Sequence, residues 1–148
     1  MIRITRMAIV TLAFMLCLAC LVFSGTAFAD RCVDNGDGTV TDNGTGLMWQ
    51  KDTAGPMNWN QAMRYASGLS LGGHSDWWLP KKHELQGLYH SPCKNMMDVE
   101  SGWGGFYWSS STGVPNAVSA WRFNFNGGAL YVEHKSNTYY VRSKRSAH

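Results

Sequence analysis

The alternation of apolar and polar residues in the last third of the chain predicts a series of short β-strands. An Asn-Gly pair between two of these strands is typical of a two-residue hairpin loop, and a Ser-Asn pair is interpreted as the next loop. The two turns together predict one antiparallel sheet. Its strands are expected at residues 106–108, 120–125, 129–134 and 138–144, with loops at 126–127 and 136–137.

The two loops also predict which side chains share a face of this sheet. They place Trp121 opposite Val132, and Val132 opposite Val141, on an apolar face that we expect to be core. The other face should be exposed to solvent, with Tyr131 facing Arg142. Its side chains are Arg122, Asn124, Tyr131, Glu133, Tyr140 and Arg142.

Two short helices are predicted before these strands. Asn58 followed by Gln61 forms a capping-box pattern, and apolar residues recur at helical spacing over 59–69. A second helix is expected over 81–89, with Pro80 near its start. Both helices should pack an apolar face against the core.

Residues 90–105 have neither helical nor strand periodicity, so the sequence predicts a long loop. Trp103 lies between glycines in this loop. Two interpretations of Trp103 stay open: an exposed contact residue, or a plug that folds back onto the core.

An N-terminal hairpin is predicted because Asn-Gly and Asp-Gly pairs precede a β-prone segment at 39–41. Trp49 follows and is expected to be core. The turns partly match a calcium-binding loop, but Val33 and Gly44 stand where acidic ligands would be needed. We therefore expect turns and not a metal site, and no cofactor.

Residues 1–29 have the pattern of a signal peptide. Arg3 and Arg6 are followed by an apolar stretch at 8–23 and a small-x-small site ending at Ala29. We expect cleavage before Asp30, a single mature domain at residues 30–148, and a secreted or periplasmic location. A retained membrane anchor and a lipidated cysteine are the alternatives.

Removal of Arg3 and Arg6 lowers the formal net charge from +3 to +1, which offers no electrostatic basis for binding nucleic acid. All seven tryptophans follow residue 29. Such an excess is typical of a dense small core or of an aromatic binding surface. We expect no membrane span after cleavage, and the oligomeric state stays open.

Two cysteines, Cys32 and Cys93, follow the predicted cleavage site. Export places them in an oxidising compartment, so we expect a disulfide. No Cys-x-x-Cys spacing favours a metal or catalytic thiol. The five histidines are scattered and belong to no catalytic motif, so no enzyme and no catalytic residue are expected.

Several motifs occur in an order that resembles the Lcl C-terminal domain family, a domain family of unknown function. They are Asp34-Asn35-Gly36-Asp37-Gly38-Thr39-Val40, Thr45-Gly46-Leu47-Met48-Trp49, Ser75-Asp76-Trp77-Trp78-Leu79-Pro80, Glu84-Leu85, Tyr107-Trp108-Ser109-Ser110 and Tyr139-Tyr140-Val141-Arg142. The resemblance implies an α+β fold similar to C-type lectins: an N-terminal hairpin, two helices, a long loop and a terminal antiparallel sheet. Ser143 stands where the family often has a cysteine, which supports the pairing of Cys93 with Cys32.

The resemblance implies an extracellular or periplasmic binding module, with some relatives linked to adhesion and glycan recognition. We therefore predict recognition of a glycan or a surface protein through the exposed sheet face and the long loop. A formylglycine-oxidase-like enzyme and a structural envelope protein without a ligand are the alternatives. The predicted ligand-binding residues are Trp103, Arg122, Asn124, Tyr131, Tyr140 and Arg142.

Overall fold

The computed structural model describes residues 31–100, 105–113 and 117–148, so the predicted signal peptide and Trp103 lie outside the described residues. The described part has a mixed α+β fold with two sheets. In chain order its elements are β1 (Cys32–Asp34), β2 (Thr39–Asp42), β3 (Leu47–Gln50), β4 (Ala54–Asn58), α2 (Trp59–Gly68), α3 (Lys82–His90), the 3-10 helix η1 (Pro92–Met96), β5 (Phe106–Thr112), β6 (Ser119–Asn124), β7 (Ala129–His134), β8 (Thr138–Val141) and β9 (Lys144–Ser146).

The first sheet has the strand order β1-β2-β3-β9 and confirms the predicted N-terminal hairpin. Asp34 Oδ1 accepts the amide of Gly36 at 3.0 Å, and Asp37 Oδ1 accepts the amide of Thr39 at 3.0 Å. These carboxylates therefore form the turns between β1 and β2. The addition of β9 to β3 was not predicted from the sequence.

The second sheet has the strand order β4-β8-β5-β6-β7. The predicted pairing of β6 with β7 is confirmed, with Trp121 opposite Val132. The predicted pairing of β8 with β7 is wrong, because β8 lies between β4 and β5 and runs parallel to β5, with Tyr140 opposite Tyr107. A tight turn does form there, since the amide of Asn137 donates to the carbonyl of His134 at 3.0 Å. The strands diverge after that turn.

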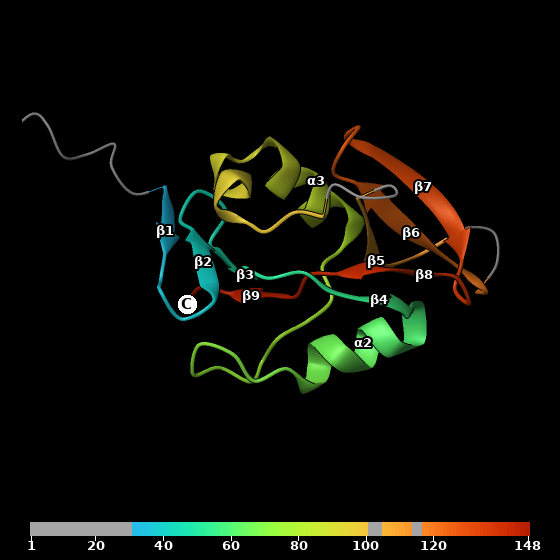
Figure 1. Ribbon diagram of the computed structural model, residues 1–148, viewed down its shortest axis with the longest axis horizontal. Helices are drawn as coiled ribbons and strands as arrows, with labels where there is room; N and C mark the ends of the chain where they lie inside the picture. Colours follow the sequence, from blue (N-terminus) through green and yellow to red (C-terminus); the bar gives the residue numbers. More distant parts are fainter. Residues whose placement is uncertain (1–30, 101–104, 114–116) are drawn as a thin grey trace, which may run out of the picture. The chain divides into compact units, whose positions relative to one another are not determined.

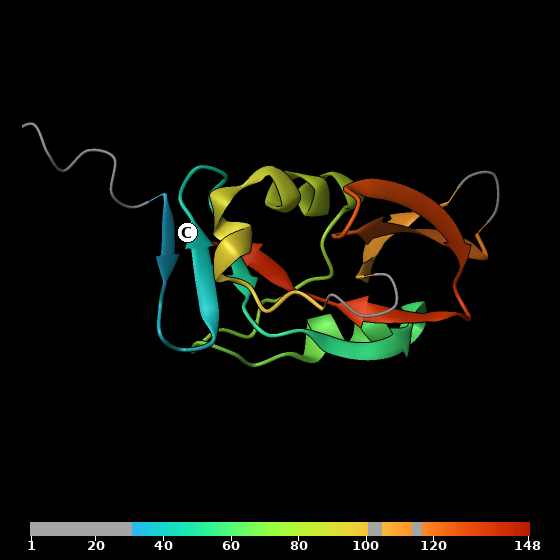
Figure 2. The same cartoon turned by 45° about the horizontal axis from the view of Figure 1, so that its top comes forward.

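Both predicted helices are confirmed. Asn58 caps α2 through the predicted capping box, in which its Oδ1 accepts the amide of Gln61 at 3.0 Å. At the start of α3, Glu84 Oε2 accepts the amide of Lys81 at 2.7 Å. In Figure 1, α3 lies above β8 and α2 below it, and in the turned view of Figure 2 α3 again lies above β8 while α2 overlaps β4 and β8.

Two apolar clusters form the core. One contains Val40, Trp49, Leu85, Leu88, Cys93, Met97, Tyr107, Phe123 and Phe125, and the other contains Ala62, Ala66, Leu79, Trp108, Ala120 and Val141. The prediction of a buried Trp49 is confirmed. The prediction for Trp121 is wrong, because this side chain is only half-buried and lies under the Lys82 ammonium, 4.0 Å from the ring centre. Trp121 thus covers the rim of the core below α3.

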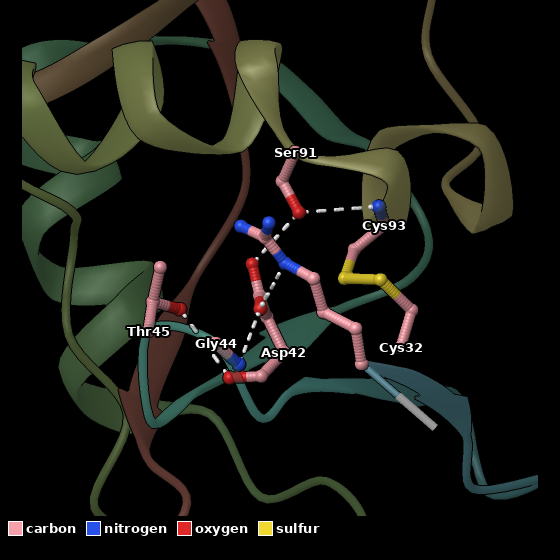
Figure 3. Close-up of a disulfide and its surroundings, with 7 residues drawn as sticks. Cys32, Asp42, Gly44, Thr45, Ser91 and Cys93 are labelled. Atoms are coloured by element: carbon pink, nitrogen blue, oxygen red, sulfur yellow. Dashed lines mark hydrogen bonds and ion pairs between the residues drawn. A yellow bond between two sulfur atoms is a disulfide. The ribbon is translucent and has the colours of Figure 1, made fainter. Parts of the chain in front are cut away.

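The predicted disulfide between Cys32 and Cys93 is present, with the two Cα atoms 5.2 Å apart. It joins β1 to η1. Beside it, the buried carboxylate of Asp42 accepts the Ser91 hydroxyl at 2.7 Å and the Gly44 amide at 2.9 Å (Figure 3). The first part of the predicted loop is therefore a short helix fixed to the first sheet by a covalent bond and a buried hydrogen bond.

Removal of the disulfide should destabilise the fold by about 4 kcal/mol in the chain-entropy treatment, because the bond closes a loop with a sequence separation of 61 residues. We expect denaturant unfolding of a Cys32→Ala/Cys93→Ala variant to show this loss. Adding a reductant should lower the denaturant midpoint of the wild type and leave the midpoint of the double variant unchanged. Two free thiols in native protein would contradict the prediction.

Candidate functional site

The clearest cluster of polar and aromatic side chains on the second sheet surrounds Arg122. Its guanidinium carbon lies 3.6 Å from the ring centre of Phe106, 4.4 Å from Tyr139 and 5.4 Å from Tyr131. One guanidinium nitrogen lies 3.5 Å from Glu133 Oε2. Arg122 Nε is buried without a hydrogen-bond partner among the described residues. Ring faces and one carboxylate therefore hold this cation.

Four strands bring these side chains together. Arg122 on β6 is directly opposite Tyr131 on β7, while Phe106 comes from β5 and Tyr139 from β8. The Phe106 ring meets the rings of Tyr131 and Tyr139 edge-on, with centroids 5.6 Å and 5.9 Å apart. This geometry is favourable for aromatic pairs and fixes the orientation of each ring.

Glu133 connects the cluster electrostatically. The backbone amide of His134 donates to this carboxylate at 3.0 Å, and this bond, with the charge of Arg122, holds the pKa of Glu133 below its ordinary value. The Tyr139 hydroxyl donates to Glu133 Oε2 at 3.3 Å. Burial raises the pKa of Tyr139. Glu133 is thus ionised and Tyr139 protonated at neutral pH.

Tyr131 is the member of the cluster that faces solvent, with 45% of its surface exposed. It lies on β7, which is an edge strand of the second sheet in the described part of the chain. The Phe106 ring packs edge-on against the Tyr131 ring and restricts its orientation. The arrangement is a preformed aromatic surface beside a cation and a carboxylate. Its chemistry suits stacking and hydrogen bonding to a ligand.

The structure brings together only part of the predicted site. Arg122 and Tyr131 are neighbours, as predicted. Asn124 lies on β6, the strand of Arg122, but its side-chain oxygen accepts the amide of Asn126 at 2.8 Å and so forms part of a turn. Tyr140 packs against the core, where its ring centre lies 5.8 Å from that of Tyr107. Its predicted place on the exposed face is wrong because β8 does not continue a hairpin from β7.

Arg142 was predicted to be exposed and is fully buried. Its guanidinium donates to the carbonyls of Gln50 at 2.6 Å, Asp98 at 2.7 Å and Lys51. It also donates to the hydroxyl of Thr53 at 3.1 Å. Arg142 is therefore a structural residue that joins the segment after β3 to the segment after η1, and it leaves the candidate site.

Burial lowers the pKa of Arg142. No carboxylate of the described residues lies within ion-pair distance of its guanidinium. The charge is offset by carbonyl oxygens, whose dipoles point at the guanidinium as a counter-charge would. The planar guanidinium donates to several acceptors at once. The ammonium of a lysine does not have this arrangement of donors.

Phe106 and Tyr139 belong to the cluster and were not predicted as site residues. Tyr139 is next to Tyr140, so an error of one position in the register of β8 exchanges the two tyrosines between faces. The signal that could have found Tyr139 was the run of two adjacent tyrosines, which has to place one ring on each side of the sheet.

The chain matches the Lcl C-terminal domain over residues 38–145. It therefore belongs to the Lcl C-terminal domain family, as its motifs predicted. No curated protein matches the chain in a sequence comparison. The helices of the described segments are all too short or too polar to cross a membrane. In those segments, no three His, Cys, Asp or Glu side chains gather where a metal ion could be held.

Replacement of Arg142 by methionine should cost at least about 3 kcal/mol of folding free energy, because it leaves several buried carbonyls without a donor. Arg142→Lys should cost less, since it keeps the charge but loses the fork. Denaturant unfolding measures both. Arg64→Met, at an exposed arginine, is the control and should have little effect. A stable Arg142→Met variant would contradict the buried position.

Acidification should weaken the cluster through Glu133. Since its folded pKa lies below the ordinary value of 4.5, Glu133 stabilises the fold above that pH, and this contribution is lost as the pH falls through the folded pKa. We expect the melting temperature of the wild type to fall more between about pH 6 and pH 3 than that of Glu133→Gln. An equal fall of the melting temperature in both proteins would show that the pKa of Glu133 does not change on folding.

Proposed function

We propose that this protein is an exported binding module without catalytic activity, which recognises a glycan or a surface protein through the cluster around Arg122. The observation that carries the proposal is the solvent-facing ring of Tyr131, which is held in a fixed orientation by Phe106 and Arg122. An aromatic ring that is ordered before binding loses little conformational entropy when a ligand stacks on it.

The chemistry beside Tyr131 supports recognition of a polar partner. Glu133 is ionised and partly exposed, and it can accept hydrogen bonds from sugar hydroxyls or backbone amides. Val132 follows Tyr131 on β7 and is 42% exposed, so it adds apolar area on the other face of this strand. Aromatic side chains next to polar groups are typical of protein recognition surfaces.

We also propose that the fold belongs with the C-type lectins. The order of a hairpin, two helices, a segment rich in loops and an antiparallel sheet supports this proposal. The signal-peptide pattern of residues 1–29 supports export, and the disulfide between Cys32 and Cys93 agrees with it, since such bonds persist in oxidising compartments.

The proposal is tested by screening the mature chain, residues 30–148, on glycan and protein arrays and measuring the affinity of each confirmed ligand. Tyr131→Ala should weaken binding by about tenfold or more, as expected for loss of an aromatic anchor. Tyr131→Phe keeps the ring and should retain most of the affinity. Met96→Ala, at an exposed residue of η1, is the control outside the cluster.

Circular dichroism must first show that each variant folds. Unchanged affinity of Tyr131→Ala for every ligand found would reject the Arg122 cluster as the binding surface. Absence of any ligand on both arrays would favour a structural envelope protein instead.

A further inference from the structure

A second feature, separate from the Arg122 cluster, is a cavity of about 400 Å³ between α2 and the segment that leads into α3. Its volume lies in the range of small-molecule binding pockets. The cavity is lined by Met63, Arg64, Ser67, Trp78, Leu79, Lys81, Ser110 and Lys144.

Trp78 is the most exposed large apolar side chain in the described part of the chain, with 59% of its surface exposed. Its backbone is nevertheless fixed, because Trp78 and Lys144 exchange two hydrogen bonds of 2.8 Å and 2.9 Å. The neighbouring Leu79 is buried and belongs to the core. The exposed indole is therefore presented at the cavity by a rigid segment and not by a mobile loop.

The charge of the cavity is positive. Among the described residues that line it, three are basic and none is acidic. Lys144 forms an ion pair of 2.9 Å with Glu84, so its charge is neutralised. For Arg64 and Lys81, no carboxylate within the described ranges lies at ion-pair distance. These two cations are available to an anion.

The polar groups of the lining are mostly hydrogen-bond donors. Besides the basic side chains there are two serine hydroxyls, and that of Ser67 donates to the backbone carbonyl of Arg64 at 3.3 Å. Met63, Trp78 and Leu79 supply apolar surface. A sugar ring needs acceptors for its hydroxyls as well as donors, and the side-chain acceptors of this lining are two serine hydroxyls. A compact apolar group with one negative charge fits it better.

We propose that this cavity binds a carboxylate attached to an apolar group, as found at the C-terminal residue of a polypeptide. The apolar part packs against Trp78, Met63 and Leu79, and the carboxylate lies toward Arg64 and Lys81. Arg64 offers paired donors that match the two oxygens of a carboxylate. This site is distinct from the surface around Tyr131 and does not depend on it.

The test uses the mature, ¹⁵N-labelled protein and follows the indole N–H signal of Trp78 by NMR, with Trp78→Phe identifying the signal. The probes are N-acetyl-phenylalanine, its amide, the peptide Gly-Gly-Phe with a free carboxylate, and glucuronate. We expect the two phenylalanine carboxylates to shift the Trp78 signal and the amide to bind roughly tenfold more weakly. The peptide should bind at least as tightly as N-acetyl-phenylalanine.

Arg64→Gln and Lys81→Gln should each weaken binding of the carboxylate probes and leave the affinity for the amide unchanged. Lys94→Gln removes a positive charge from η1 and should have no effect. Tyr131→Ala should also have no effect, which separates this site from the Arg122 cluster. The spectra report the folding of each variant directly.

Three results would overturn the proposal. Equal affinity for the acid and the amide would show that the carboxylate is not recognised. Tighter binding of glucuronate would identify a sugar site. No shift of the Trp78 signal with either phenylalanine carboxylate, up to the solubility limit, would show that the cavity does not bind this class. Binding of N-acetyl-phenylalanine without the peptide would exclude a polypeptide end as the source.

Discussion

The fold depends on one buried cation. Arg142 lies at the end of β8, and its guanidinium holds the chain after β3 and the chain after η1 through their carbonyl oxygens. Gln50 reinforces this junction, because its side-chain oxygen accepts the amide of Ser143 at 3.1 Å. Both sheets meet here, since Gln50 ends β3 in the first sheet and Arg142 follows β8 in the second. The carbonyls would be unsatisfied without the donor, and the donor would be an uncompensated charge without the carbonyls.

The position of β8, directly before this junction, decides which residues gather at the candidate site. Because β8 lies between β4 and β5, Tyr140 faces the cluster that contains Tyr107, and Tyr139 faces Arg122. The exposed surface therefore consists of a firmly packed base and one outward ring, that of Tyr131. Arg122 itself supports the surface by holding three rings in place, and it is largely covered by them.

Local features of this fold could be predicted from the sequence. The capping box of α2 and the hairpin between β6 and β7 are encoded by neighbouring residues, and the structure has both. The disulfide could be predicted because only two cysteines follow the predicted cleavage site. The position of β8 could not be predicted, since a turn at 134–137 forms whether or not the strands beyond it stay paired. Arg142 looked like a surface residue because its acceptors lie 44 to 92 positions away and most are backbone carbonyls, which carry no sequence signal.

The pairing of β9 with β3 makes the first sheet depend on two pieces of chain that are synthesised at very different times. Met48 and Arg145, which are opposite each other in this pair, are 97 residues apart. A growing chain presents β1, β2 and β3 early, and the outer edge of β3 stays without a partner until residues 144–146 emerge. Pairing of β9 with β3 therefore covers this edge only after residues 144–146 have been synthesised. A polypeptide released before it is complete would carry an open β-edge, which is the kind of surface that chaperones and proteases encounter first.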